Sequence, residues 1–292
     1  MLRRLLAPLL FGLVACGHAP PPPPTAPAAS PASAGAAPAP AASQAGPALR
    51  ELPELVKEFE AARVTGTIAL YDSQTGVLGC SDVKRCSRAM TPASTFKIPH
   101  SMIALETGVV EGPDTLMPWD KQQYWVENWN QDLKFRDAFR VSCVPCYRAI
   151  ARKVGEQQEH DWVQKLGYGN RDTSGGVDRF WLWGGLRITP LEQIDFLRRF
   201  DGNQLPISER TADIVRDIMT LDVTERYVLR GKTGSAGPPD ETEEVYWLVG
   251  WLELGARRVF FATLIDSHAE DVDPMQVRRS LTERLLRAQG YL

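Results

Sequence analysis

Histidine is scarce in this chain of 292 residues, which contains four: His18, His100, His160 and His268. None of them stands in a pattern that would pair it with a nucleophile and a carboxylate, so the sequence gives no support for a Ser-His-Asp triad. A basic stripe is also missing, because 33 lysines and arginines are interspersed with 36 aspartates and glutamates. This charge balance argues against a nucleic-acid partner.

Long apolar runs are absent as well. The run from Leu5 to Ala15 is too short for a permanent transmembrane helix, but it follows two arginines and has the shape of an export signal. It ends in Leu13-Val14-Ala15-Cys16, which resembles the lipobox of bacterial lipoproteins, where the cysteine is lipidated and becomes the mature N-terminus. We therefore expect a lipoprotein signal peptide over residues 1–16, lipidation of Cys16, and a periplasmic protein tethered to a bacterial membrane. The alternative is an ordinary cleaved signal with an incidental cysteine.

Composition divides the rest of the chain into two parts. Residues 17–49 consist largely of proline, alanine, serine and glycine, with an unbroken proline run from Pro20 to Pro24. Such a stretch cannot bury a core and is expected to be an extended, disordered linker. Residues 50–292 have the composition of one globular domain that is long enough to bury a large core, and they contain no internal repeat.

Cysteine use in this domain fits an exported protein. After Cys16 the chain has Cys80, Cys86, Cys143 and Cys146, an even number. Two disulfides are expected in an oxidising compartment, and of the three possible connectivities we favour the local one, Cys80–Cys86 with Cys143–Cys146. A four-sulfur zinc site is the rival interpretation.

Apolar periodicity predicts an α/β domain of the α+β type. Two strands, residues 245–254 and 257–265, are joined at Gly255-Ala256, which is a hairpin signal. Strands near both ends with helices between them predict a central antiparallel sheet flanked by helices, an inserted helical lobe, and a site where the two meet. The other expected elements are helices over 51–62, 147–153, 159–166, 190–200 and 274–289 and a strand over 67–71.

A hydroxyl and an amine stand three residues apart in Pro92-Ala93-Ser94-Thr95-Phe96-Lys97-Ile98-Pro99. If Thr91 caps a helix that begins at Pro92, then Ser94 and Lys97 share one face, and the amine can take the hydroxyl proton. Near the helix start, the backbone N–H of Ser94 would be free to hold an oxyanion. Taken alone, the motif is weak, because two solvated residues at a helix start would look the same.

Three further motifs strengthen the interpretation of Ser94 and Lys97 as catalytic residues. The chain also has Ser142-Cys143-Val144 in the lobe, Tyr168-Gly169-Asn170 in a loop and Lys232-Thr233-Gly234 on a strand. In this order they resemble the class D serine β-lactamases, the oxacillinases. Related penicillin-recognising enzymes usually carry Asn or Asp where this chain has Val144. The resemblance extends to Phe180-Trp181-Leu182, Leu186-Arg187-Ile188, Val249-Gly250-Trp251 and Arg278.

The resemblance implies a serine β-lactamase or penicillin-binding-protein-like fold and hydrolysis of β-lactam antibiotics, which confers resistance. Ser94 would be the nucleophile, and Lys97, carboxylated by carbon dioxide, would be the general base. Ser142 would relay a proton to the leaving nitrogen, helped by the charge of Lys232. No metal and no organic cofactor are implied, only carbon dioxide or bicarbonate for Lys97.

The remaining roles follow from the same resemblance. An apolar pocket of Phe96, Val144 and Leu182 would lower the pKa of Lys97, and the indole N–H of Trp181 would bind the added carboxylate. The substrate would be bound at the strand end and the last helix, with the backbone N–H groups of Ser94 and Ser235 as the oxyanion hole. The residues given to substrate binding are Thr233, Gly234, Ser235 and Arg278.

Three positions depart from the family pattern. His100 stands where Asn is usual, Trp183-Gly184 where Glu-Gly is common, and Ser235 where a bulkier residue often stands. We interpret His100 as a packing or capping residue, because a single unpartnered histidine is a poor triad signal. The alternatives to a hydrolase are a penicillin-binding sensor that stays acylated and a D-Ala-D-Ala peptidase or transpeptidase. The sequence leaves the substrate spectrum, the oligomeric state and the membrane leaflet open.

Overall fold

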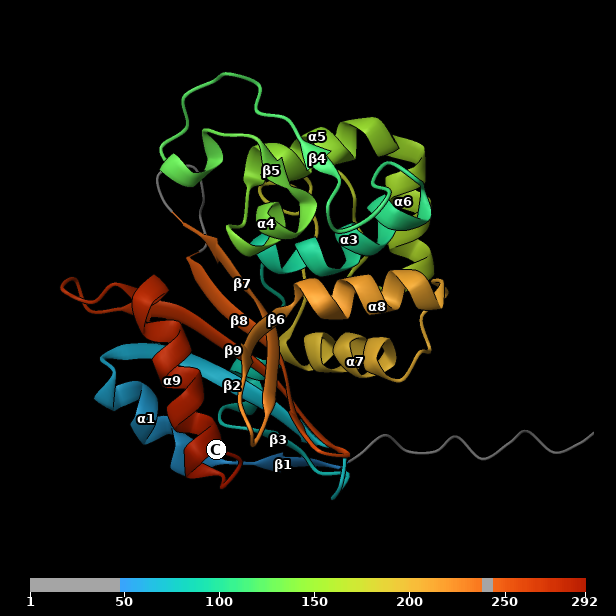
Figure 1. Cartoon of the computed structure of the whole chain (residues 1–292). Helices are drawn as coiled ribbons and strands as arrows, with labels where there is room; N and C mark the ends of the chain where they lie inside the picture. The colour runs from blue at the N-terminus through green and yellow to red at the C-terminus, as the bar shows by residue number, and fades with distance from the viewer. Residues whose placement is uncertain (1–47, 238–243) are drawn as a thin grey trace, which may run out of the picture. The chain divides into compact units, whose positions relative to one another are not determined.

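A computed structural model describes residues 48–237 and 244–292. Its centre is a sheet of seven strands in the order β1-β3-β2-β9-β8-β7-β6 (Figure 1). All neighbouring strands are antiparallel except β1 and β3, which run parallel. The strands are β1 (Leu49–Glu51), β2 (Val64–Asp72), β3 (Leu78–Cys80), β6 (Thr220–Val223), β7 (Val228–Ala236), β8 (Val245–Leu254) and β9 (Arg257–His268).

Helices cover both faces of this sheet. On one face α1 and α9 pack against β2, β8 and β9, and on the other α7 packs against β2, β8 and β9 (Figure 1). A helical lobe is built around α3, which contacts α5, α6 and α8, and it includes the short pair β4 (Leu116–Met117) and β5 (Leu133–Lys134). The helices are α1 (Val56–Ala61), α2 (Val83–Cys86), α3 (Lys97–Glu106), α4 (Phe135–Arg140), α5 (Val144–Val154), α6 (Glu156–Leu166), α7 (Pro190–Asp201), α8 (Glu209–Ile218) and α9 (Pro274–Ala288), with 3-10 turns η1 (Pro53–Leu55), η2 (Ala93–Phe96) and η3 (Glu127–Trp129).

The central strands are apolar on both faces because both faces are covered. Along β8, Trp247, Val249 and Trp251 belong to the core on the lobe side. Leu248, which lies between Trp247 and Val249, and Leu252, which follows Trp251, belong to the core under α1 and α9. Successive side chains of a strand point to opposite faces, so one strand contributes to both cores.

Local sequence signals account for several element boundaries. Thr189 and Glu192 form a capping box at the start of α7, with Pro190 at its first position. The β8–β9 hairpin turns at Gly255, whose φ of 63° lies in the left-handed region that glycine enters without strain. The predicted helices over 147–153, 159–166, 190–200 and 274–289 and all three predicted strands are confirmed, each within a few residues.

Near the domain's start the prediction is partly wrong. A helix was expected over 51–62, but Glu51 ends strand β1, and the backbone N–H of Leu52 bonds to Cys80 O at 2.8 Å. Pro53 then begins a 3-10 turn, and α1 starts only at Val56. Pairing with β3, which comes later in the chain, overrides the local helical pattern here. The predicted signal peptide, Cys16 and most of the linker lie outside the described residues.

The predicted disulfides are confirmed. Cys80 pairs with Cys86, and Cys143 pairs with Cys146. These bonds leave none of the four sulfurs free for the rival zinc site.

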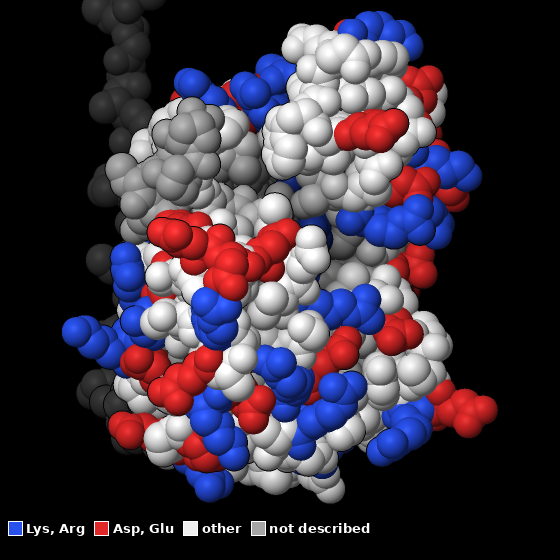
Figure 2. All heavy atoms as spheres, turned by 90° about the vertical axis from the view of Figure 1, so that its left-hand side faces the viewer, with Lys and Arg blue, Asp and Glu red and all other residues white. Residues whose placement is uncertain are grey.

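The surface carries charges of both signs side by side. Figure 2 shows basic and acidic side chains intermingled over one face of the molecule. Many are paired, for example Arg279 with Glu283 and Arg284 with Glu58. Exposed pairs of this kind contribute at most about 1 kcal/mol each. Within the described parts of the chain, no helix is long and apolar enough to cross a membrane.

Removing the Cys80–Cys86 bond tests the contribution of the disulfide that joins β3 to α2. The double substitution Cys80→Ala/Cys86→Ala is expected to lower the free energy of unfolding by about 2 kcal/mol, because the unfolded chain regains loop freedom. The thermal midpoint should fall by roughly 4–8 °C. Chemical and thermal unfolding under non-reducing conditions measure both. An unchanged midpoint would show that the bond does not stabilise the domain.

Candidate active site

Ser94 lies in the buried 3-10 turn η2, which runs directly into α3. The expected cap is wrong: Pro92, not Thr91, is the N-cap, and no side chain caps this end. Instead the Thr95 hydroxyl donates to Pro92 O at 2.7 Å. Ala93 has a φ of 48°, a left-handed conformation that costs an alanine on the order of 1 kcal/mol. The turn that presents Ser94 is therefore held in a strained conformation by its surroundings.

Lys97 directs its amine at Ser94. Its Nζ lies 2.9 Å from Ser94 Oγ, although the two residues belong to a 3-10 turn and an α-helix and not to one helix as predicted. The side chain is fully buried, and desolvation lowers the pKa of Lys97 from its usual 10.5 to about 7. A large share of these amines is therefore uncharged at neutral pH, and an uncharged amine can accept the hydroxyl proton.

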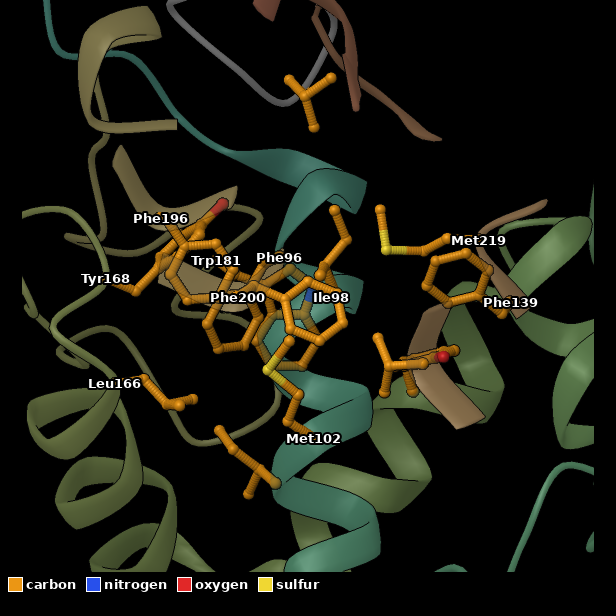
Figure 3. Close-up of a cluster of buried hydrophobic side chains, with 14 of the residues drawn as sticks. Phe96, Ile98, Met102, Phe139, Leu166, Tyr168, Trp181, Phe196, Phe200 and Met219 are labelled. Carbon is orange, nitrogen blue, oxygen red and sulfur yellow. The ribbon is translucent and has the colours of Figure 1, made fainter. Parts of the chain in front are cut away.

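Aromatic rings form the wall around this amine. Phe96 stacks on Trp181 with ring centroids 5.6 Å apart, and the Tyr147 ring centroid lies 5.0 Å from Lys97 Nζ. Figure 3 shows Phe96, Tyr168 and Trp181 gathered beside the helix that carries Met102. Of the predicted pocket residues, Phe96, Trp181 and Leu182 are buried and Val144 is half-buried.

One residue of this wall, Trp181, carries a buried hydrogen-bond donor. The indole Nε1 of Trp181 is buried, and no described residue accepts its hydrogen bond. An unpaired buried donor costs free energy unless a further group binds it. An apolar pocket with an uncharged amine and a free indole N–H fits a carboxylated lysine.

The lobe and the sheet meet at a second serine and lysine. Ser142, in the turn between α4 and α5, has a φ of 57°, and its Oγ accepts a hydrogen bond of 2.9 Å from Lys232 Nζ on β7. Burial holds the pKa of Lys232 well below its usual value, and repulsion from Lys97 and from Arg278 adds to the effect. The repulsion from Lys97 disappears when that amine is neutral and becomes an attraction when it carries a carboxylate. Lys232 is therefore a more stable cation beside a carboxylated Lys97.

The Cys143–Cys146 disulfide follows Ser142 directly. Cys143 is the N-cap of α5, and its Sγ accepts a hydrogen bond from the backbone N–H of Cys146 at 3.2 Å. The covalent bond and the helix start together hold the turn in which Ser142 lies. Val144, which was predicted to line the lysine pocket, is the first residue of the same helix and packs against the core on the lobe side.

Gly234 lets β7 lie against the turn of Ser94. A β-carbon at this position would stand 2.9 Å from Pro92 O, closer than packed atoms allow, and 3.0 Å from Thr95 Cγ2, closer than most packed contacts. Thr233 and Ser235 flank it, half-buried and exposed respectively. Arg278 reaches this strand from α9, and its Nη1 donates to Gly234 O at 3.0 Å. Burial lowers the pKa of Arg278 to about 10, so it remains a cation at neutral pH.

The Tyr168-Gly169-Asn170 motif fixes the loop that carries Trp181. The Tyr168 hydroxyl lies 3.1 Å from Gln193 Nε2 and 3.3 Å from Thr95 Oγ1. Asn170 accepts from the backbone N–H of Arg187 and donates to Gly185 O. The contacts of Tyr168 connect this loop to η2 and α7, and those of Asn170 connect its two ends.

His100 and Glu159 form a buried pair that was not predicted from the sequence. His100 Nε2 lies 2.8 Å from Glu159 Oε1, and both side chains are almost fully buried. The expectation that His100 only packs or caps is therefore incomplete. A signal was present, because Glu159 shares the apolar face of α6 with Val163 and Leu166, where a carboxylate needs a partner.

Comparison with known proteins agrees with this geometry. Residues 66–287 match the family described as penicillin binding protein transpeptidase domain. The chain is 36% identical over 237 residues to the β-lactamase OXA-10 of Pseudomonas aeruginosa, covering 81% of this chain and 88% of that protein. It is also 36% identical over 234 residues to the β-lactamase OXA-48 of Klebsiella pneumoniae, covering 80% and 87% respectively.

A solved structure shares the fold. The class D β-lactamase YbXI from Nostoc aligns with a TM-score of 0.78 at 41% identity, over 82% of this chain and 99% of that one. The predicted fold class, a central sheet flanked by helices with a helical lobe, is thereby confirmed. With these relatives, and with Ser94, Lys97, Ser142 and Lys232 brought together as the motifs require, the chain belongs to the class D β-lactamases.

Proposed function

We propose that this protein hydrolyses β-lactam antibiotics through an ester on Ser94, with carboxylated Lys97 as the general base, and so confers resistance on the cell that makes it. The observation that carries the proposal is the 2.9 Å contact between Lys97 Nζ and Ser94 Oγ in a pocket that lowers the amine's pKa to about 7. Membership of the class D β-lactamases supports the same reaction.

Lys97 is suited to react with carbon dioxide. Only a neutral amine can do so, and burial keeps a large fraction of Lys97 neutral at pH 7. The carboxylate so carried on Nζ would serve as the base in both half-reactions. Trp181 would donate its indole N–H to that carboxylate, and the surrounding rings would keep bulk water away from it.

In acylation each polar residue near Ser94 would have its own role. Ser94 Oγ loses its proton and attacks the lactam carbonyl, while the backbone N–H groups of Ser94 and Ser235 hold the oxyanion. As the C–N bond breaks, Ser142 gives its proton to the ring nitrogen and takes one from Lys232, 2.9 Å away. Before deacylation the base passes the proton that it took from Ser94 on to Lys232. A water then attacks the ester and gives its proton to the base, and as the bond to Ser94 breaks that proton passes to Ser94 Oγ.

The end of β7 would hold the substrate's carboxylate. Arg278 and Lys232 provide positive charge on either side of Gly234, and the Thr233 hydroxyl provides a donor between them. Charge-assisted hydrogen bonds of this kind are stronger than neutral ones and fix the orientation of a carboxylate. These contacts would place the lactam carbonyl beside Ser94.

We also propose that the chain is exported and anchored as a lipoprotein through Cys16, with residues 17–49 as a linker to the catalytic domain. The support is sequence alone: the apolar run after Arg3 and Arg4, the lipobox-like Leu13-Val14-Ala15-Cys16, and the proline-rich composition that follows. In the periplasm the enzyme could hydrolyse an incoming antibiotic before it reaches the enzymes that build the cell wall.

Turnover of a chromogenic cephalosporin by the full chain, with and without bicarbonate, tests the main proposal. Activity should fall as the pH drops below about 7 in carbonate-free buffer, because Lys97 gains a proton there, and bicarbonate should restore it. Lys97→Ala should lower kcat at least about 100-fold at every bicarbonate concentration.

Other outcomes would point elsewhere. Retained hydrolysis in Lys97→Ala would contradict the mechanism. A stoichiometric burst without turnover would indicate a penicillin sensor, and release of D-alanine from a model peptide would indicate a cell-wall peptidase.

Gly234→Ala tests the close contact between β7 and η2. The added methyl group would push Pro92 and Thr95 away and separate the substrate-binding strand from Ser94, so kcat/KM should fall by about 100-fold. Gly112→Ala is the matched control, since its methyl group would meet nothing closer than 3.5 Å. Equal kinetics for the two variants would refute the packing argument.

Cys16→Ala tests the anchor. The wild-type protein should be recovered from membranes with detergent and should incorporate labelled palmitate. The variant should lose the label and leave the membrane fraction. Equal membrane association of the two proteins without labelling would contradict lipidation at Cys16.

A further inference from the structure

A buried polar pair lies behind the lysine pocket. The side chains of His100 and Glu159 are 0% and 1% exposed and are joined through Nε2 and Oε1 at 2.8 Å. Burying an imidazole and a carboxylate is unfavourable unless both are fully hydrogen-bonded, and an apolar pair of similar volume often stabilises a core as well or better. Stability alone therefore does not account for this pair.

Its position relates it to the general base. His100 follows Lys97 by three residues on α3, which puts both on one face of the helix. Its ring centroid lies 5.0 Å from that of Trp181, edge to face, and 5.5 Å from that of Tyr147. Tyr147 in turn borders Lys97 Nζ at 5.0 Å. The imidazole thus supports two of the rings that surround the amine.

Glu159 fixes the orientation of the His100 imidazole ring. His100 Nδ1 and Glu159 Oε2 have no hydrogen-bond partner among the described residues. The bond from Nε2 to Oε1 is therefore the polar contact that orients the ring. An imidazole free to rotate would present a different edge to Trp181, and the indole would no longer be held at one angle.

We propose that His100 and Glu159 are positioning residues for the general base: they hold Trp181 so that its indole N–H meets the carboxylate on Lys97, and thereby set how firmly carbon dioxide is retained. The inference rests on the proposed function. Carbon dioxide adds to the neutral Nζ as one proton leaves, so Lys97 changes from neutral to negative. A bound, aligned indole N–H favours that negative state.

The test compares full-length wild-type protein with Glu159→Gln and with His100→Phe, which keeps a ring at this position but cannot hydrogen-bond to Glu159. The bicarbonate concentration for half-maximal turnover should rise about tenfold in each single variant, as for other residues that orient a functional group through a hydrogen bond. Saturating bicarbonate should restore kcat. Glu156→Gln makes the same change on the exposed side of α6 and should behave like the wild type.

Carbon-13 NMR gives a readout that does not depend on turnover. With labelled bicarbonate below saturation, the signal of carboxylated Lys97 should be weaker in Glu159→Gln, which keeps the size of the side chain, than in Glu156→Gln. Equal signals and equal bicarbonate requirements would overturn the inference while leaving the proposed function intact. A loss of turnover that bicarbonate does not restore would also overturn it. A wild-type protein with neither signal nor bicarbonate dependence would refute the proposed function itself.

Discussion

The burial of one amine is the constraint on which the rest of the site depends. Moving the pKa of Lys97 from 10.5 to about 7 corresponds to on the order of 5 kcal/mol of lost solvation for the charged form. The domain offsets this cost with the two apolar cores around the sheet and α3. A looser pocket would admit water, and Lys97 would remain an ordinary ammonium group.

The architecture brings the reacting groups together from three separate segments. Ser94 and Lys97 come from η2 and α3, Ser142 from the lobe turn before α5, and Lys232 from β7. Two non-glycine residues with positive φ, Ala93 and Ser142, stand at these junctions. Strain of this kind persists only where the surrounding packing and the neighbouring disulfide hold it.

Sequence alone predicted what short motifs and local patterns encode. Ser94, Lys97, Ser142 and Lys232 could be predicted because the motifs that contain them resemble those of a known family. The hairpin at Gly255 could be predicted because its turn needs a left-handed residue, which glycine provides. Contacts made by distant segments could not be predicted. The pairing of β1 with β3 replaced the start of an expected helix. The apolar face of α6 indicates that Glu159 needs a partner, but it does not identify that partner as His100 on α3.

The longest-range pairing in the sheet has a consequence for the order in which the domain forms. Strand β2 precedes Ser94 in the chain and pairs along its whole length with β9, which follows Lys232. Contacts so far apart in sequence form slowly, because a long loop must close before they contribute. A chain emerging from the ribosome therefore carries Ser94, Lys97 and Lys232 before the central sheet that completes their surroundings can assemble.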